Sequence, residues 1–212
     1  MNYGRANAAI GFAVGLGALV LQFALTVPAA METRSLPLAL LFFFSFFTIL
    51  SNLSLVLVYL SELAPNLPLG VFRSPTVRGM MVAVMALVLL FYHFLLAGSW
   101  DPQGPYLIAD RLLHYATPLI YAIWWARFVQ HGSLKLTDLP AMLLPTLVYF
   151  LLILLRGLFV AEYPYFILEV GRLGYPAVLL NALFVAAGLA VLSAIVIAID
   201  HLLARPTRTN LA

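Results

Sequence analysis

Six long apolar segments, separated by short polar connectors, make up most of the chain. They lie at residues 6–27, 36–60, 77–97, 106–129, 139–160 and 175–203. At a helical rise of about 1.5 Å per residue, each is long enough to cross a hydrocarbon core of about 30 Å. The connectors hold the prolines, glycines and charges typical of loops, and none is long enough for a soluble domain. The pattern predicts an all-α polytopic membrane protein in which residues 1–212 form a single domain, a bundle of six transmembrane helices.

The composition agrees with a membrane location and narrows the possible chemistry. Hydrophobic residues make up 64% of the chain and charged residues 9%, against roughly 25% charged residues in soluble domains. The chain has no cysteine, which excludes disulfides, metal–thiolate sites and cysteine nucleophiles. The net charge of +3 is spread thinly over short loops. We therefore expect no nucleic-acid partner.

The basic residues predict the orientation of the bundle in the membrane. One side receives Arg5, Arg73, Arg78, Arg127, Lys135, Arg205 and Arg208. The other side receives Arg34, Arg111, Arg156 and Arg172. By the positive-inside rule, both termini are expected in the cytoplasm. The segment at 6–27 is longer than the about 7–15 apolar residues of a signal peptide, so we expect it to be a transmembrane helix.

A polar stripe runs along the fourth apolar segment. Asp110, His114, Thr117 and Tyr121 stand at i, i+4, i+7 and i+11, which places them on one face of a helix. Polar side chains are costly in a membrane unless they face partners or water, so such a stripe predicts a functional site. Pro118 lacks the N–H that would bond the carbonyl of His114, so we expect the helix to bend at the histidine and to leave that carbonyl free.

A second polar face occurs in the second apolar segment. Thr48, Ser51 and Asn52 stand at i, i+3 and i+4 in a run rich in phenylalanine, and we expect them to face the interior of the bundle. By residue count, Thr48 lies roughly 18 Å and His114 roughly 12 Å below the outer ends of their helices. The two side chains come from different helices at similar depth. They are therefore candidates to meet in a cavity in the outer half of the membrane.

The chemistry that this pair could support is nucleophilic catalysis. A threonine hydroxyl becomes a nucleophile when a base removes its proton, and an imidazole is the usual base. Asp110, one helical turn before His114, is a candidate to orient the ring. Candidates for donating a hydrogen bond to an oxyanion are Asn52, Asn181 and Tyr121. The alternatives are that Thr48 only bonds a backbone carbonyl of its own helix, and that Asp110 pairs with Arg111 or water.

Other polar residues in the outer half of the helices are candidates for binding a substrate. Arg156 can hold a carboxylate with two hydrogen bonds, or can form an ion pair with Glu162 or Glu169. His93 and Ser51 are further candidates, although a histidine near the end of a helix can also simply reach the interface.

Metal and haem sites are two further interpretations of the histidines. His93, His114 and Asp110 are ligand types for zinc, but no H-x-x-H or H-E-x-x-H spacing occurs in the chain. A haem held between His93 and His114 would need the two rings to face each other at matched depth. We expect neither a metal nor a cofactor.

Three short motifs carry a resemblance to a known family. They are Phe47 to Asn52 in the second segment, Leu112-Leu-His114 at the start of the fourth, and Glu162 to Glu169 before the sixth. In this order, over six helices, the chain resembles the androgen-induced membrane protein family. That family includes the androgen-dependent regulator of tissue factor pathway inhibitor and many bacterial six-helix proteins. The chain departs from the animal members at 115–118, where a second histidine and further threonines are replaced, and it has an extra tyrosine, Tyr165.

The resemblance implies a function. Animal members of the family are intramembrane threonine hydrolases that cleave fatty acid esters of hydroxy fatty acids, with a threonine in the second helix and a histidine early in the fourth. By position these residues are Thr48 and His114. The chain is thus expected to be a bacterial member in the inner membrane that hydrolyses a lipid ester taken from the bilayer. The alternatives are a lipid-binding or transport protein without chemistry and a structural subunit; the oligomeric state is left open.

Overall fold

The computed structural model describes residues 3–99 and 101–204, and this part of the chain is all-α, as predicted. Arg205 and Arg208, used above for the orientation, lie outside it. The α-helices are α1 (Tyr3–Met31), α2 (Leu36–Phe43), α3 (Phe47–Leu63), α4 (Pro75–Phe91), α5 (Pro105–Arg111), α6 (Thr117–Phe128), α7 (Leu139–Val160) and α8 (Val170–Leu203). Short helical turns are η1 (Gly70–Arg73), η2 (Tyr92–Leu96), η3 (Leu112–Ala116), η4 (Leu136–Asp138) and η5 (Phe166–Leu168).

Several of these helices are long and apolar enough to cross a membrane, which indicates a polytopic integral membrane protein. Within the described residues there are four such helices, at 3–31, 75–96, 136–160 and 170–203, and the bent pair of α2 and α3 makes a fifth if it counts as one span. The segment from α5 to α6 is not among them. It holds Asp110, Arg111 and His114 in its first half, and these lower its hydropathy.

The second predicted helix is broken, which corrects the prediction of one helix over 36–60. Helix α2 ends at Phe43 and α3 begins at Phe47, and the two are bent by 77° relative to each other. Phe46 is extended, with φ −80° and ψ 125°. The Ser45 hydroxyl donates a hydrogen bond of 2.6 Å to the Phe42 carbonyl oxygen, a local bond that competes with helix continuation. The break creates a new helix N-terminus inside the bundle.

The fourth predicted helix is interrupted near His114, as expected, but by a π-helical turn rather than by a simple bend. Helices α5 and α6 are joined by η3, a π-helical turn in which the Thr117 N–H bonds the Leu112 carbonyl five residues back. In this pattern the partner of the Leu113 carbonyl would be residue 118, which is a proline without an N–H. Side chains bond this carbonyl instead: Asn52 Nδ2 and Thr117 Oγ1, each at 3.2 Å. The Leu113 carbonyl, which lacks a backbone partner in this pattern, is therefore bonded by side chains.

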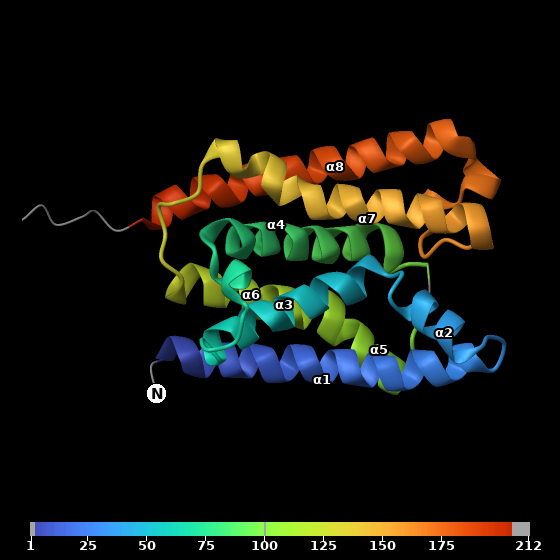
Figure 1. The fold of residues 1–212 in the computed structure, drawn as a ribbon, viewed down its shortest axis with the longest axis horizontal. Helices are drawn as coiled ribbons and strands as arrows, with labels where there is room; N and C mark the ends of the chain where they lie inside the picture. Colours follow the sequence, from blue (N-terminus) through green and yellow to red (C-terminus); the bar gives the residue numbers. More distant parts are fainter. Residues whose placement is uncertain (1–2, 100, 205–212) are drawn as a thin grey trace, which may run out of the picture.

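The helices run roughly along one common direction (Figure 1). The start of α1 and the end of α8 lie at one end of the bundle, and the connections from α1 to α2 and from α7 to α8 lie at the other end (Figure 1). Helix α3 packs on α1 so closely that a Cβ at Gly11 would collide with the Tyr59 ring. Helix α3 runs from the middle of the bundle toward the end where α1 begins (Figure 1). The first turn of α3, with Thr48, consequently lies within the bundle.

Candidate active site

Thr48 lies in the first turn of α3, where the backbone N–H groups have no partner in the preceding turn of helix. Phe46, at the N-cap, offers no side-chain hydrogen bond to them. The Thr48 N–H points to the hydroxyl oxygen of Tyr165, 3.4 Å away. A helix N-terminus also carries a partial positive charge. The Thr48 hydroxyl therefore stands beside backbone and side-chain groups that favour a developing negative charge.

The His114 ring reaches Thr48 from the other broken helix. Its Nε2 lies 3.2 Å from Thr48 Oγ1. Its Nδ1 lies 3.0 Å from the Asp110 carbonyl oxygen and 3.2 Å from Asp110 Oδ1. Both neighbours of Nδ1 are acceptors, so this nitrogen carries the proton and Nε2 is left to accept one from the threonine hydroxyl. The buried carboxylate is also placed to stabilise a positively charged ring.

Tyr92, on η2, holds both members of this histidine–aspartate pair. Its hydroxyl donates a hydrogen bond of 2.6 Å to Asp110 Oδ2, and its ring stacks on the imidazole with 3.9 Å between the ring centroids. The sequence pattern pointed to the neighbouring His93 as a candidate and did not single out Tyr92. The sequence signal for Tyr92 was its spacing from Met85 and Val88. This spacing places all three side chains on one face of the α4–η2 segment, which is the buried face.

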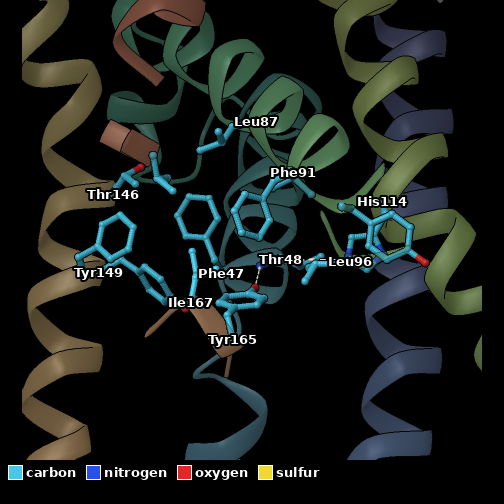
Figure 2. A pocket seen from close by; sticks show the side chains of 14 residues that line it. Phe47, Thr48, Leu87, Phe91, Leu96, His114, Thr146, Tyr149, Tyr165 and Ile167 are labelled. Atoms are coloured by element: carbon cyan, nitrogen blue, oxygen red, sulfur yellow. Dashed lines mark hydrogen bonds between the residues drawn. The ribbon is translucent and has the colours of Figure 1, made fainter. Parts of the chain in front are cut away.

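Two chambers meet at Thr48 and His114. The first, with a cavity volume of about 50 Å³, is almost wholly apolar and lies between α3, α4, α7 and α8; we call it the apolar chamber. The second, with a cavity volume of about 440 Å³, lies toward α1, α2 and α5 and has both polar and apolar walls; we call it the mixed chamber. Five residues line both, namely Thr48, Tyr92, Leu96, His114 and Tyr165. Figure 2 shows Thr48 at one side of the apolar chamber, between Tyr165 and Leu96, with Thr146 and Tyr149 across from it.

Asn52 and Ser51 bond the backbone carbonyl of Thr48. The Asn52 amide nitrogen donates to the Thr48 carbonyl at 2.9 Å and to the Leu113 carbonyl at 3.2 Å. Both of its hydrogens are thus used in tying α3 to η3, and none is left for an oxyanion. The Ser51 hydroxyl donates to the same Thr48 carbonyl at 3.1 Å, and Ser51 lines neither chamber.

The remaining candidates do not join the pair. Tyr121 donates to the Arg78 carbonyl at 3.0 Å, and Asn181 donates to the Ile167 carbonyl at 2.9 Å. His93 is exposed, and its Nδ1 lies 3.1 Å from the hydroxyl of Tyr115. None of these three candidates lines either chamber. Within the described ranges, no three His, Asp or Glu side chains form a group that could hold a metal ion.

Arg156 forms the ion pair that was one of its two interpretations. Its guanidinium donates to the Glu162 carbonyl at 2.6 Å and to the Glu162 carboxylate at 2.7 Å. Arg34 bonds the other oxygen of that carboxylate at 2.5 Å, so the connection from α1 to α2 is tied to the one from α7 to α8. Hydrogen bonds from the two arginines hold the pKa of Glu162 below its usual value.

This ion-pair network predicts a pH-dependent contribution to stability. A carboxyl whose pKa is lowered by folding stabilises the protein above its unfolded-state pKa, and loses this contribution as the pH falls through the folded-state value. The carboxylate is partly exposed, so we expect Glu162→Gln to cost about 1 kcal/mol or less at neutral pH. Thermal unfolding of the wild type and the variant in detergent would measure this difference in stability. A difference from wild type that persists at a pH below the folded-state pKa would contradict the assignment.

The chain has no match among protein-family models, curated proteins or solved structures. The resemblance to the androgen-induced membrane protein family therefore stays a prediction from three short sequence motifs. Two of these motifs supply Thr48 and His114, and the third contains Tyr165.

Proposed function

We propose that the protein is an intramembrane hydrolase of lipid esters that uses Thr48 as its nucleophile and His114 as its base. The observation that carries the proposal is the 3.2 Å contact between Thr48 Oγ1 and a histidine nitrogen whose partner nitrogen is held by Asp110. A hydroxyl, an imidazole and a carboxylate in this order form the arrangement of a nucleophilic triad. The resemblance to the threonine hydrolases of the androgen-induced family favours the same pair.

In the first half of the reaction, Thr48 Oγ1 attacks the ester carbonyl carbon and its proton passes to His114 Nε2. The carbonyl oxygen becomes an oxyanion next to the Thr48 N–H and the Tyr165 hydroxyl, which are suited to donate hydrogen bonds to it. The tetrahedral intermediate then collapses. The bond to the alcohol oxygen breaks, His114 returns the proton to that oxygen, and the acyl group stays on Thr48.

In the second half, water takes the place of the alcohol. His114 removes one of its protons, the hydroxyl oxygen attacks the acyl carbon, and the bond to Thr48 Oγ1 breaks as the proton returns to that oxygen. The products are a carboxylic acid, an alcohol and the regenerated enzyme. The Asp110 carboxylate offsets the positive charge of the ring in both halves.

The membrane is the source of the substrate in this proposal. In this proposal the chain crosses a bacterial inner membrane six times, with the bent α2–α3 pair and the α5–η3–α6 segment counted as one span each. Both termini then lie on the cytoplasmic side, as the positive-inside rule favours for the side with most basic residues. Fatty acid esters of hydroxy fatty acids, the substrates of the animal family members, or similar esters fit this setting. The two chambers would serve equally well in the alternative, a lipid-binding or transport protein without chemistry.

A fluorophosphonate probe separates these functions, because it reacts only with an activated hydroxyl. We expect the purified protein to be labelled, and the labelling to be lost in both Thr48→Ala and His114→Ala. Ser54→Ala is the matched control, since Ser54 lies on the same helix and its hydroxyl bonds the Leu50 carbonyl. Labelling that survives Thr48→Ala would exclude this nucleophile. Lipid flux into liposomes that persists in both alanine variants would favour the transport alternative.

A further inference from the structure

We propose that the two chambers divide the substrate at its ester bond, with the acyl chain in the apolar chamber and the alcohol in the mixed chamber. This inference rests on the proposed hydrolase function and deepens it. The chambers meet at the nucleophile and the base, so an ester carbonyl placed at Thr48 has one arm in each. The preferred substrate class is then an ester of a long, unsubstituted acyl chain with a bulky alcohol that carries polar groups.

The walls of the apolar chamber suit a hydrocarbon chain. Beyond the shared residues they consist of aromatic and aliphatic side chains and one threonine, including Phe47, Leu87, Phe91, Phe150, Ile167 and Val185. No residue in this lining is exposed within the described chain. A methylene chain brings no donors or acceptors of its own into this chamber, whereas an additional polar group would be costly to bury there.

The walls of the mixed chamber suit an amphipathic group and water. They include the side chains of Gln22, Thr26, Ser99, Tyr106 and Asp110, beside several phenylalanines. Tyr106 and Phe166, which also line it, are exposed, so this chamber reaches the surface of the protein. Water can therefore enter it more readily than the apolar chamber.

The chemistry assigns the arms to the chambers. The alcohol oxygen must receive its proton from His114 and then depart, so that a water molecule can occupy the same place. The mixed chamber follows the histidine helix, because Tyr106, Asp110 and Leu113 line it together with His114. In the apolar chamber His114 is the only lining residue between 105 and 128. The acyl group, which remains bonded to Thr48, is thereby directed toward Phe47 and the walls from α4, α7 and α8.

Filling each chamber separately tests the assignment. One series of substrates varies the acyl chain of 4-nitrophenyl esters from butyrate to palmitate; the other varies the alcohol of butyrate esters from butanol to hexadecanol. We expect Val185→Phe, which narrows the apolar chamber, to lower kcat/KM for palmitate by about tenfold or more and to spare butyrate esters of every alcohol. Thr26→Phe narrows the mixed chamber. We expect this variant to lower kcat/KM for the butyrate esters of long alcohols and to leave the order of kcat/KM within the acyl series unchanged.

Matched controls add the same bulk outside the chambers. Leu183→Phe on α8 and Val20→Phe on α1 change exposed side chains. Neither variant should alter the dependence of kcat/KM on chain length in either series. Leu87→Phe is a second filling variant of the apolar chamber, in case Val185→Phe does not fold. The reversed pattern, or no change of length preference in any filling variant of an active protein, would overturn the assignment. A wild-type protein that hydrolyses no ester of either series would instead overturn the proposed function, and this inference with it.

Discussion

Thr48→Ala is expected to reduce ester hydrolysis by about 10³-fold or more, and to leave only the residual catalysis that binding and oxyanion stabilisation provide. The variant removes the atom that would form the acyl-enzyme, and no other hydroxyl of α3 can replace it. Ser51 and Ser54 lie on the same helix, but their hydroxyls bond the carbonyls of Thr48 and Leu50. The measurement is kcat/KM for a 4-nitrophenyl ester in detergent or liposomes.

Two further variants decide whether Thr48 acts together with His114. Thr48→Ser keeps a hydroxyl at the same position and should retain part of the activity. The double variant Thr48→Ala with His114→Ala should be no slower than either single variant, because residues that act as one unit lose their function together. If the double variant loses as much activation free energy as the two single variants together, the two residues work independently. Ser54→Ala, with wild-type activity, controls for changes in α3.

Asp110→Asn is expected to lower kcat by about 10²–10³-fold, less than the roughly 10⁴-fold loss known for the aspartate of a Ser-His-Asp triad. In such a triad the carboxylate fixes the tautomer and also stabilises the charged ring. Here the Asp110 backbone carbonyl, 3.0 Å from His114 Nδ1, still holds the proton on that nitrogen after the substitution. The variant therefore removes the charge and keeps the orientation. Tyr92 can still bond the new amide.

The division between kcat and KM tests this role. A carboxylate that stabilises only the charged ring of the transition state should change kcat and leave KM nearly constant. A purely structural role would lower the melting temperature and the amount of active protein, with kcat per active site unchanged. Asp101→Asn, at an exposed aspartate before α5, is the matched control. An Asp110→Asn variant with wild-type kcat would remove Asp110 from the mechanism.

The broken helices show where reasoning from sequence reached its limit. Over residues 36–60 apolar residues are nearly continuous, and hydrophobicity alone cannot tell one helix from two joined by an extended residue. The break at 44–46 depends on how Ser45 and the surrounding phenylalanines pack. Pro118, by contrast, has a local consequence, and the interruption near His114 could be predicted from it. The π-helical turn, and the two side chains that bond the Leu113 carbonyl there, have no comparable signature in the sequence.

The site shows the same contrast. Thr48 and His114 were selected from residue type, depth and resemblance, and the structure places them 3.2 Å apart. Tyr92 was overlooked, and Tyr165 was noted only as a departure from the family. Both are tyrosines in a chain rich in aromatic residues, and their importance comes from contacts with residues distant in sequence. Asn52 was noticed for its hydrogen-bonding capacity, and the structure directs that capacity to two backbone carbonyls.

The sequence by itself determined that the protein is helical and apolar enough for a membrane, and predicted that its few helical polar residues concentrate in the outer half of the membrane. These properties follow from composition and periodicity, which are local and additive along the chain. Only the tertiary structure decided which polar groups meet, where the helices break and how two chambers join at Thr48. Inside a membrane each polar group must find a partner within the protein, and that choice depends on the packing of all helices together.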